Sequence, residues 1–463
     1  MYSVITYLYM CGIIGLISNK TDVPLKLYEG LTFLQHRGQD SAGMCNETLC
    51  IKDHGLVKDV FKESDLDSLR SNIGIGHVRY GTTGNFDDSC VQPLCNNEYK
   101  RVSLCHNGNI VNTDEIKSLI QKDNINSDSE CLLYLFCHIM NEYGWENISY
   151  TNIFETCQQL MKIVKGSYSV VLLIKDYGMV SFRDIFGIRP LCYGSKQNDF
   201  LIASESVVVD ALEYQFIRDV HPGEIIIFQH NEMPRFCQYV ESRLYPCLFE
   251  FIYFSRIDSI IDNISIYDAR FKMGQLLGEK IKSMEITDID LIVPVPDSSL
   301  IFALGVQDVL NIKTCNGFVK NNYIERTFIM KEDKIIQKSI KRKINAVKSV
   351  IQNKNILVVD DSIVRGNTSS HIVYLAKRAG TKKIYFGSGA PPILYHNQYG
   401  IFIPDRNDLI AVNRTPQNIA DILGCTKVIY NELPQIINCL KSINPKIDGF
   451  ETSMLDNNHL FLK

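Results

Sequence analysis

The 463-residue sequence has no CxxC pair, no cysteines paired at zinc-site spacing, no internal repeat and no low-complexity tract. Its 15 cysteines are scattered along the chain, and several, such as Cys45 and Cys131, lie in stretches typical of a core or a helix. This distribution indicates neither a disulfide framework nor a zinc site. It favours a protein of the reducing cytoplasm.

The chain also lacks a charge excess and a long apolar segment. Its formal net charge is -4, with 22% charged and 45% hydrophobic residues, a composition typical of soluble globular proteins. We therefore expect it to bind neither nucleic acid nor a membrane, so any phosphate site must be local. The apolar run over 2–17 is too short for a membrane span and lacks the basic start and cleavage site of a signal peptide.

The length and the pattern of the chain predict two domains. In the first half, short runs rich in β-branched and aromatic residues are separated by turns, and helical periodicity appears over 129–143. From about Arg243, short apolar strands alternate with longer helical segments, which predicts βαβ units and a parallel sheet. The boundary is expected near 240–250, and the end of the chain is expected to be a weakly structured tail.

The clearest motif is NILVVDDSIVRGNTSS, residues 355–370. An apolar strand is expected to end at two carboxylates, Asp360 and Asp361, and a loop rich in Gly, Ser and Thr then leads into a helix. Such a loop and helix start can cradle a phosphate, while the carboxylates can accept hydrogen bonds from ribose hydroxyls or support hydrated Mg²⁺. A solvated turn followed by a helix cap is the alternative. The apolar strand before the pair and the hydroxyl-rich loop after it favour a phosphoribose site.

Two further segments could complete that site. The loop VPVPDSS (293–299) also follows a strand, so Ser298 and Ser299 could contact pyrophosphate or a metal, although a proline-stiffened turn is the simpler interpretation. In the segment 317–334, Lys320 and Arg326 could close over pyrophosphate as a mobile flap. A solvated basic surface is an equal alternative for that segment.

In the first half, Cys11 must be weighed against inert burial, which is the usual fate of a cysteine. Three loops combine glycine with charged or amide groups: LQHRGQDSAG (34–43), GHVRYGTTG (76–84) and HNGNI (106–110). A fourth, NSDSE (126–130), carries acidic, amide and hydroxyl groups. Individually each is a turn. Together they could supply what a thiol amidohydrolase needs, namely a cation, oxyanion donors and an acid for a substrate amine.

With these motifs in order, and with GSYSVV, RDIFGIRPL, ASES, PGE, RTFI and LIAVNRT between or after them, the chain resembles the glutamine phosphoribosylpyrophosphate (PRPP) amidotransferase family. The resemblance runs from Cys11 to about Leu433. It implies an α+β plus α/β fold, in which an N-terminal αββα sandwich of the N-terminal nucleophile (Ntn) hydrolases (11–243) precedes a parallel-sheet phosphoribosyltransferase domain (244–440) and a tail (441–463).

The resemblance also implies an activity. A pentosyltransferase of this family hydrolyses glutamine to glutamate and ammonia and channels the ammonia to PRPP. The products are 5-phosphoribosylamine and pyrophosphate, in the first committed step of de novo purine synthesis. Purine nucleotides are implied as feedback inhibitors, and a homo-oligomer, either a dimer or a tetramer, is implied as the assembly.

Residue roles follow from the same resemblance. Cys11 would be the nucleophile with its own α-amine as base, Asn107 and the N–H of Gly108 would form the oxyanion hole, and Arg79 and Asp128 would bind the α-carboxylate and α-amine of glutamine. One Mg²⁺ per subunit would lie near Ser298, Asp360 and Asp361. The implied PRPP-binding residues are Asp360, Asp361, Ser362, Ile363, Val364, Arg365, Gly366, Asn367, Thr368 and Ser369, together with Lys320 and Arg326.

Some positions depart from the family pattern. Asn322, Glu325 and Ile336 stand where the family usually has Arg, Gly and Arg, which leaves the details of the flap open. One branch of the family holds an iron–sulfur cluster on four cysteines. Here Cys247 matches the first, Asn397 occupies the second position and the C-terminal pair is missing, so no cluster is expected.

Other functions of the same domains fit the sequence less well. Glucosamine-6-phosphate synthase and asparagine synthetase share the first domain but need no PRPP loop, and a PRPP-binding regulator would need no nucleophile. An inactive homologue stays possible on sequence alone. A free α-amine on Cys11 also requires that residues 1–10 be absent from the active enzyme. Either they are a propeptide that is removed during maturation, or translation starts at Met10 and an aminopeptidase removes that single residue.

Overall fold

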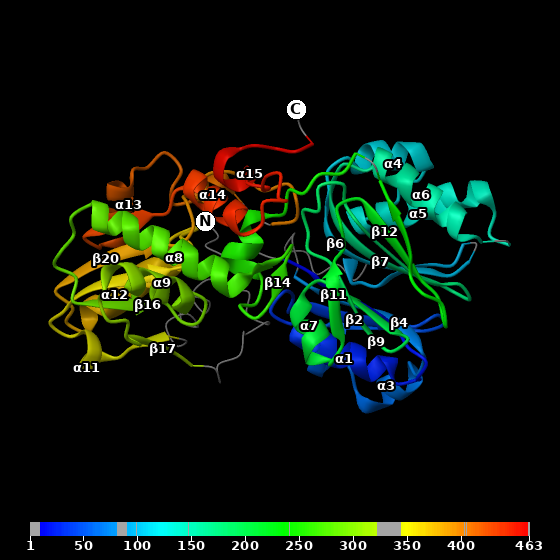
Figure 1. Ribbon diagram of the computed structural model, residues 1–463, viewed down its shortest axis with the longest axis horizontal. Helices are drawn as coiled ribbons and strands as arrows, with labels where there is room; N and C mark the ends of the chain where they lie inside the picture. The colour runs from blue at the N-terminus through cyan, green and yellow to red at the C-terminus, as the bar shows by residue number, and fades with distance from the viewer. Residues whose placement is uncertain are drawn as a thin grey trace.

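The computed structural model describes residues 10–80, 90–98, 100–146, 148–239, 241–321, 344–401, 403 and 405–461. The expectations for residues 1–9 and for Asn322, Glu325, Arg326 and Ile336 lie outside these residues. The two halves of the chain lie side by side, with the N-terminal half on the right in Figure 1. Among the described helices, none combines the length and the apolar character that a membrane crossing requires.

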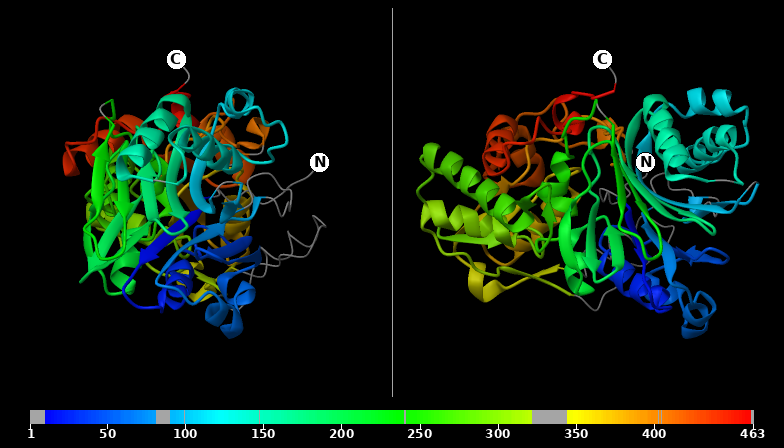
Figure 2. Two further views of the ribbon diagram at one scale, coloured as in Figure 1. Left: turned by 90° about the vertical axis from the view of Figure 1, so that its right-hand side faces the viewer. Right: turned by 45° about the vertical axis from the view of Figure 1, so that its right-hand side comes forward.

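Two stacked antiparallel sheets form the N-terminal half (Figure 2). The seven-stranded sheet has the order β11 (Gln215–Asp219), β9 (Cys192–Lys196), β10 (Asp199–Ala203), β1 (Gly12–Ile17), β4 (Ile73–Arg79), β2 (Ser41–Cys45), β3 (Cys50–His54). The six-stranded sheet has the order β13 (Arg235–Gln238), β12 (Glu224–Phe228), β8 (Gly178–Arg183), β7 (Gly166–Ile174), β6 (Val102–Ile110), β5 (Leu94–Asn96).

Helices cover the outer face of each sheet. The seven-stranded sheet packs against α1 (Val23–Phe33) and α7 (Ser206–Ala211), and the shorter α2 (Val57–Val60) and α3 (Glu63–Ser68) lie near its edge. The six-stranded sheet packs against α4 (Thr113–Ile120), α5 (Asp128–Tyr143) and α6 (Tyr150–Ile163). The predicted αββα sandwich is therefore confirmed.

The position of strand β1 between two cores explains why its sequence is apolar throughout. Its side chains alternate between two cores, because successive residues of a strand point to opposite faces. Ile14 and Leu16 pack outward against α1, whereas Ile13 and Ile17 pack inward between the two sheets. A strand buried on both faces needs hydrophobic residues at every position, which is the pattern GIIGLI.

The C-terminal half contains the predicted parallel sheet, with the order β16 (Leu291–Pro294), β19 (Asn355–Asp360), β20 (Lys383–Ser388), β21 (Lys427–Tyr430). One face packs on α8 (Ile266–Ser283), α9 (Leu300–Leu310) and α14 (Leu433–Ile443), and the other on α12 (Asn367–Arg378) and α13 (Pro416–Leu423). Smaller elements are the π-helix Glu250–Phe254, β14 (Ile260–Ile261), β15 (Ile264–Ser265), β17 (Phe318–Lys320), β18 (Ile344–Ala346), α11 (Lys348–Ile351) and the 3₁₀ turn Arg406–Asp408.

The end of the chain is packed rather than loose, so the expectation of a weakly structured tail is wrong for residues 444–461. It includes α15 (Ser453–Asp456), and Phe450, Met454 and Leu455 are buried in the core of the C-terminal half. Leu248 N–H donates to the Glu451 carbonyl at 3.1 Å. The apolar side chains anchor the segment, and sequence composition did not reveal the surface that receives them. The domain bounds 11–243, 244–440 and 441–463 stay predictions.

Candidate functional site

Cys11 lies immediately before β1, at the junction of the two halves. Gly12 pairs with Val78 in the antiparallel ladder of β1 and β4, so Cys11 is next to Arg79 in the register. The Arg37 Nε donates a hydrogen bond to the Cys11 carbonyl at 2.8 Å. The backbone of Cys11 is thus held on one side by a strand and on the other by a buried guanidinium.

The surroundings keep the Cys11 thiol protonated. Burial raises the pKa of this thiol to about 11, while Arg79 lowers it and Asp128 raises it further. A thiol with such a pKa is almost fully protonated at neutral pH and is a weak nucleophile by itself. A base must therefore take its proton if it is to attack a substrate.

Asn107 and Gly108 lie on β6, in the part of the strand that faces this junction. The Asn107 Nδ2 is buried and has no hydrogen-bond acceptor among the residues described. A buried donor without an acceptor is costly, so such groups call for a ligand or a water. Gly108 has a φ of 153°, and a Cβ there would collide with the Ser167 carbonyl, so this position needs glycine.

Asp128 is the first residue of α5, whose N-terminus is capped by Ser127. Its carboxylate accepts hydrogen bonds from Ile110 N–H at 3.1 Å and Ser129 N–H at 2.8 Å. The first bond joins the start of α5 to the end of β6, the strand that carries Asn107. A carboxylate is also favoured at this end of a helix by the helix dipole. Arg79 and Asp128 are thus close enough to Cys11 to act on its thiol, and Asp128 is bonded to the strand that carries Asn107 and Gly108.

Four charged side chains lie beneath Cys11, and the sequence motifs assign no role to any of them. Arg37 Nη2 donates to Glu250 at 2.7 Å, and Arg37 Nη1 donates to Glu205 at 2.5 Å. Arg189 Nη1 lies 3.5 Å from Glu250. All four side chains are at most 1% exposed. This buried network joins the N-terminal half to the π-helix that begins the C-terminal half.

A loop of the C-terminal half, residues 397–401, lies directly against the N-terminal half. Asn109 Nδ2 donates to the Gln398 carbonyl at 2.8 Å, and Ser167 Oγ donates to the Tyr399 carbonyl at 2.8 Å. A Cβ on Gly400 would lie 3.2 Å from the carbonyl of Gly108. The neighbourhood of Asn107 and Gly108 is thus completed by the other half of the molecule.

The amide of Asn397 shapes this loop. Its Oδ1 accepts from Tyr399 N–H at 2.8 Å and from Ile401 N–H at 3.1 Å. Position 397 therefore has a structural use as asparagine. Cys247, the only match to the family's cluster ligands, is fully buried, and burial raises the pKa of its thiol to about 12. The expectation that no cluster forms stays a prediction.

The second candidate site lies at the carboxyl edge of the parallel sheet. β16 and β19 are neighbours, so the residues that follow them meet, as is usual for ligand sites in parallel sheets. Ser298 Oγ donates to the Asp361 carboxylate, and Ser299 Oγ donates to the Asp360 carboxylate at 3.0 Å. Burial, and then the neighbouring Asp361, raise the pKa of Asp360 well above its usual range. Two buried carboxylates at such close range favour a bound cation.

The loop after the acidic pair packs closely on the protein and leads into a helix with no side-chain cap. Gly366 has a φ of 80° and precedes α12, and a Cβ there would collide with Ile410. No side chain caps α12, so the N–H groups of its first turn are available to an anion. Arg365 pairs with Asp408 at 2.8 Å, and Ile410 N–H donates to the Val364 carbonyl at 2.9 Å.

The donors at this site suit Mg²⁺. Asp360, Asp361 and Ser298 present carboxylate and hydroxyl oxygens, which are the ligands that this hard cation prefers. Lys320 is exposed and pairs with Asp297 at 2.8 Å, so its predicted contact with pyrophosphate requires that this ion pair open. Its partner in the predicted flap, Arg326, lies outside the described residues.

Known proteins resemble this chain over nearly its full length. A family model for a glutamine amidotransferase domain matches residues 85–211. The amidophosphoribosyltransferase of Escherichia coli is 41% identical over 96% of this chain and 92% of its own length. That of Saccharomyces cerevisiae is 40% identical over 97% of this chain and 92% of its own length.

Solved structures extend the likeness to the fold. The glutamine PRPP amidotransferase from B. subtilis, complexed with ADP and GMP, has a TM-score of 0.84 at 28% identity and covers 97% of both chains. An allosteric regulatory enzyme of purine biosynthesis has a TM-score of 0.85 at 29% identity over 97% of this chain and 96% of its own. By sequence identity over nearly its full length and by its fold, the chain belongs to the amidophosphoribosyltransferase family.

Proposed function

We propose that this chain catalyses the reaction for which its family is named. It hydrolyses glutamine at Cys11, and the released ammonia displaces pyrophosphate from C1 of PRPP to give 5-phosphoribosylamine for purine synthesis. The observation that carries this proposal is the presence in one chain of two sites. One is the Cys11 thiol under the charges of Arg79 and Asp128, and the other is a buried acidic pair at the end of a strand of the parallel sheet.

In the first step, the α-amine of Cys11 takes the proton of the thiol, and the sulfur attacks the side-chain amide carbon of glutamine. Asn107 Nδ2 and the Gly108 N–H donate to the oxyanion that forms, and one such donor contributes about 10²–10³-fold to the rate in comparable sites. Ammonia then leaves with a proton from the amine, and water hydrolyses the thioester. Arg79 binds the α-carboxylate of glutamine, and Asp128 binds its α-amine.

This mechanism requires that Cys11 be the first residue of the active enzyme. Met10 is 3% exposed and its Sδ lies 2.8 Å from Arg189 Nη1, so its removal opens a buried position beside the network of charges. Mass spectrometry of the purified enzyme tests the requirement directly. Active protein that retains Met10 would contradict the role of the α-amine.

In the second step, Asp360 and Asp361 hold the ribose hydroxyls of PRPP, and the loop 362–369 binds its 5-phosphate. Ser298 and the acidic pair would hold Mg²⁺, which would neutralise part of the charge of the pyrophosphate. Lys320 and Arg326 close over that leaving group. Ammonia reaches C1 inside the molecule, and the contacts of residues 397–401 with the strand of Asn107 support a short route between the halves.

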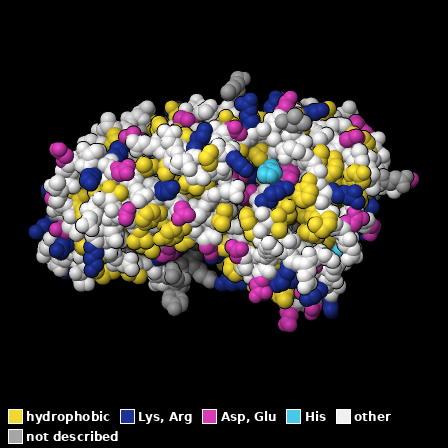
Figure 3. Space-filling view, viewed as in Figure 1, with side chains coloured by type: hydrophobic (Ala, Val, Ile, Leu, Met, Phe, Trp, Pro, Cys, Tyr) yellow, Lys and Arg dark blue, Asp and Glu magenta, His cyan; other side chains and the backbone are white. Residues whose placement is uncertain are grey.

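The proposal extends to the location, the oligomeric state and the inhibition of the enzyme. The enzyme is a cytoplasmic homo-oligomer, a dimer or a tetramer, and purine nucleotides inhibit it. The relative that was solved with ADP and GMP supports the inhibition. Lys, Arg, Asp and Glu side chains are interspersed on the face shown in Figure 3, which agrees with a protein whose partners are small molecules.

The decisive experiment compares Cys11→Ala with Cys439→Ala, a half-buried cysteine on α14. We expect Cys11→Ala to lose phosphoribosylamine formation from glutamine and PRPP but to keep formation from ammonium and PRPP. The control should keep both. Glutamine-driven synthesis by Cys11→Ala at the wild-type rate would overturn the proposal.

A further inference from the structure

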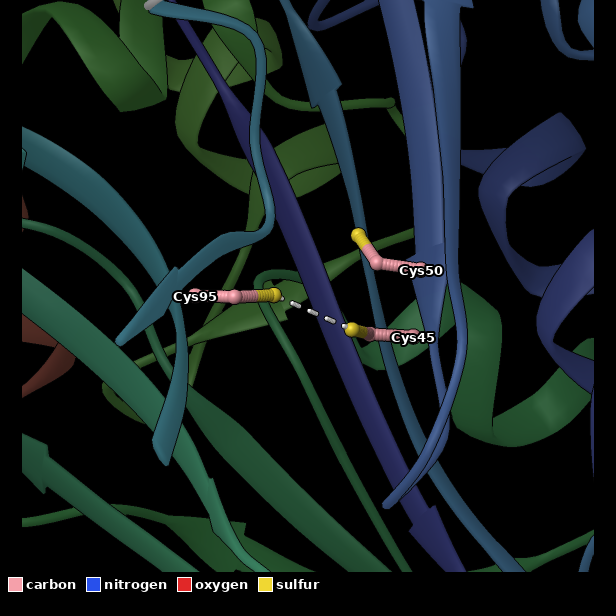
Figure 4. A group of neighbouring side chains, drawn as sticks. All are labelled: Cys45, Cys50 and Cys95. Carbon is pink, nitrogen blue, oxygen red and sulfur yellow. Dashed lines mark hydrogen bonds between the residues drawn. The ribbon is translucent and has the colours of Figure 1, made fainter. Parts of the chain in front are cut away.

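Three cysteines outside both sites converge at the edge of the sandwich. Cys45 and Cys50 face each other across the hairpin of β2 and β3, and Cys95 reaches them from β5 of the opposite sheet. Their sulfur atoms all lie within 4.8 Å of one another, and those of Cys45 and Cys95 are 3.5 Å apart. Figure 4 shows the side chains of Cys45 and Cys95 pointing toward each other, with that of Cys50 beside them.

These separations suit one shared metal ion. Two sulfurs bound to the same Zn²⁺ at about 2.3 Å lie about 3.8 Å apart in tetrahedral geometry and about 4.0 Å apart in trigonal geometry. The spacing of Cys45, Cys50 and Cys95 brackets those values, so only small side-chain rotations would be needed. Sulfur is also the ligand that selects soft cations such as Zn²⁺ and Cu(I) over Mg²⁺.

Neighbouring groups stabilise negative charge on the cluster. Arg101 Nη2 lies 3.7 Å from the sulfurs of both Cys45 and Cys95. Ser103 Oγ lies 3.4 Å from the sulfur of Cys45 and 3.3 Å from that of Cys95. Metal ligands must be thiolates, so a cation beside the sulfurs assists binding.

The cluster can be reached from solvent. Cys50 and Cys95 are half-buried, and Arg101 also lines a surface hollow with Glu47 and Lys100. A metal therefore has a path to the sulfurs.

From this geometry we infer that Cys45, Cys50 and Cys95 form a binding site for one thiophilic d¹⁰ cation, Zn²⁺ or Cu(I), which ties the edge of one sheet to the edge of the other. The site is separate from the glutaminase centre. Cys45 pairs with Ile75 on β4, four positions before Arg79, which is about 13 Å along a strand. The ion would thus stiffen the sandwich without touching glutamine.

The test uses the full-length, reduced and metal-free enzyme. Cd²⁺ is added first, because its thiolate complexes absorb in the ultraviolet, and Zn²⁺ and Cu(I) are then titrated against chelating indicators. We expect one ion per chain, a rise in the midpoint of thermal unfolding, and binding about 100-fold weaker or worse in Cys50→Ser and Cys95→Ser. The cation that binds more tightly is the one that the site takes. Zn²⁺ would complete its coordination with an added oxygen ligand, whereas Cu(I) would need only the three sulfurs.

Cys237→Ser is the matched control, because Cys237 is a half-buried cysteine on β13 of the same half. It should bind the metal as the wild type does. Glutamine hydrolysis by the metal-free Cys50→Ser and Cys95→Ser enzymes should match that of the wild type, which shows that they fold. The inference is overturned if none of the three ions binds, or if binding survives both substitutions. A different role for the cluster would be shown if its thiols form a disulfide on exposure to air while the reduced, metal-free enzyme takes up no ion. That result would also overturn the inference.

Discussion

Arg37 offers the sharpest test of how the two halves are joined. Its guanidinium and the Glu205 carboxylate are 0% exposed, and the Glu250 carboxylate is 1% exposed. Replacing Arg37 by Met keeps much of the volume but leaves two buried carboxylates without their shared cation. Removing one partner of a buried ion pair costs about 3–5 kcal/mol. At about 2–4 °C per kcal/mol for a domain of this size, the midpoint of thermal unfolding should fall by about 6–20 °C.

Trp145 provides the assay, because it is the single tryptophan of the chain and lies in the N-terminal half. Its fluorescence during unfolding in urea reports the stability of the half that carries Arg37. Arg235→Met is the matched control, since Arg235 pairs with Glu232 at the surface, where both side chains are more than 40% exposed. An exposed pair contributes about 0–1 kcal/mol, so the control should unfold almost as the wild type does.

A double substitution makes the reasoning refutable. Arg37→Met with Glu205→Gln removes a positive and a negative charge together, and Glu250 keeps Ser255 at 2.8 Å and Arg189 at 3.5 Å. The double variant should therefore lose about 0.5–3 kcal/mol less than the sum of the two single losses. Strict additivity, or a loss below about 1 kcal/mol in Arg37→Met, would show that the network does not hold the halves in the way described.

Three other predictions follow from the same geometry. Asp360→Asn should abolish synthesis from ammonium and PRPP while glutamine hydrolysis persists, and unchanged synthesis would remove Asp360 from the PRPP site. Asn107→Ala should lower kcat for glutamine hydrolysis about 10²–10³-fold with ammonium-driven synthesis intact, and a loss below about tenfold would exclude an oxyanion role. Burial raises the pKa of Glu205, but the charges and hydrogen bonds of His36 and Arg37 outweigh it and hold that pKa below its usual value. This contribution to stability is present above about pH 4.3 and is lost as the pH falls below it, so the wild type should lose stability on acidification and Glu205→Gln should lose less.

Much of the candidate chemistry could be predicted from local sequence. The alternation of buried faces requires apolar residues throughout strands such as β1 and β19, so these strands were visible without a structure. The acidic pair Asp360 and Asp361 follows its strand directly, and the loop before α12 carries its own hydroxyl groups. Each of these features lies within a few residues of its neighbours, where backbone preferences and side-chain pattern act together.

The burial of the C-terminal residues 444–461 could not be predicted from the local sequence. Its polar turns suggested a loose end, yet Phe450 and Met454 fill the core of the C-terminal half. Phe461 N–H donates to the Tyr399 hydroxyl at 3.2 Å, and its ring lies 4.9 Å from that of Phe186 in the N-terminal half. Burial of this kind depends on a surface made by distant parts of the chain, and composition does not describe that surface.

The sequence by itself determined which residue types stand where chemistry needs them: a thiol before β1, an amide and a glycine on β6, and a carboxylate pair after β19. Only the tertiary structure decided which of them share an environment. Arg37 meets Glu205 and Glu250 across 168 and 213 residues of chain, and Cys95 meets Cys45 across the gap between two sheets. Contacts between side chains so far apart depend on how sheets stack and halves dock, because local preference places each residue on its strand but not against its partner.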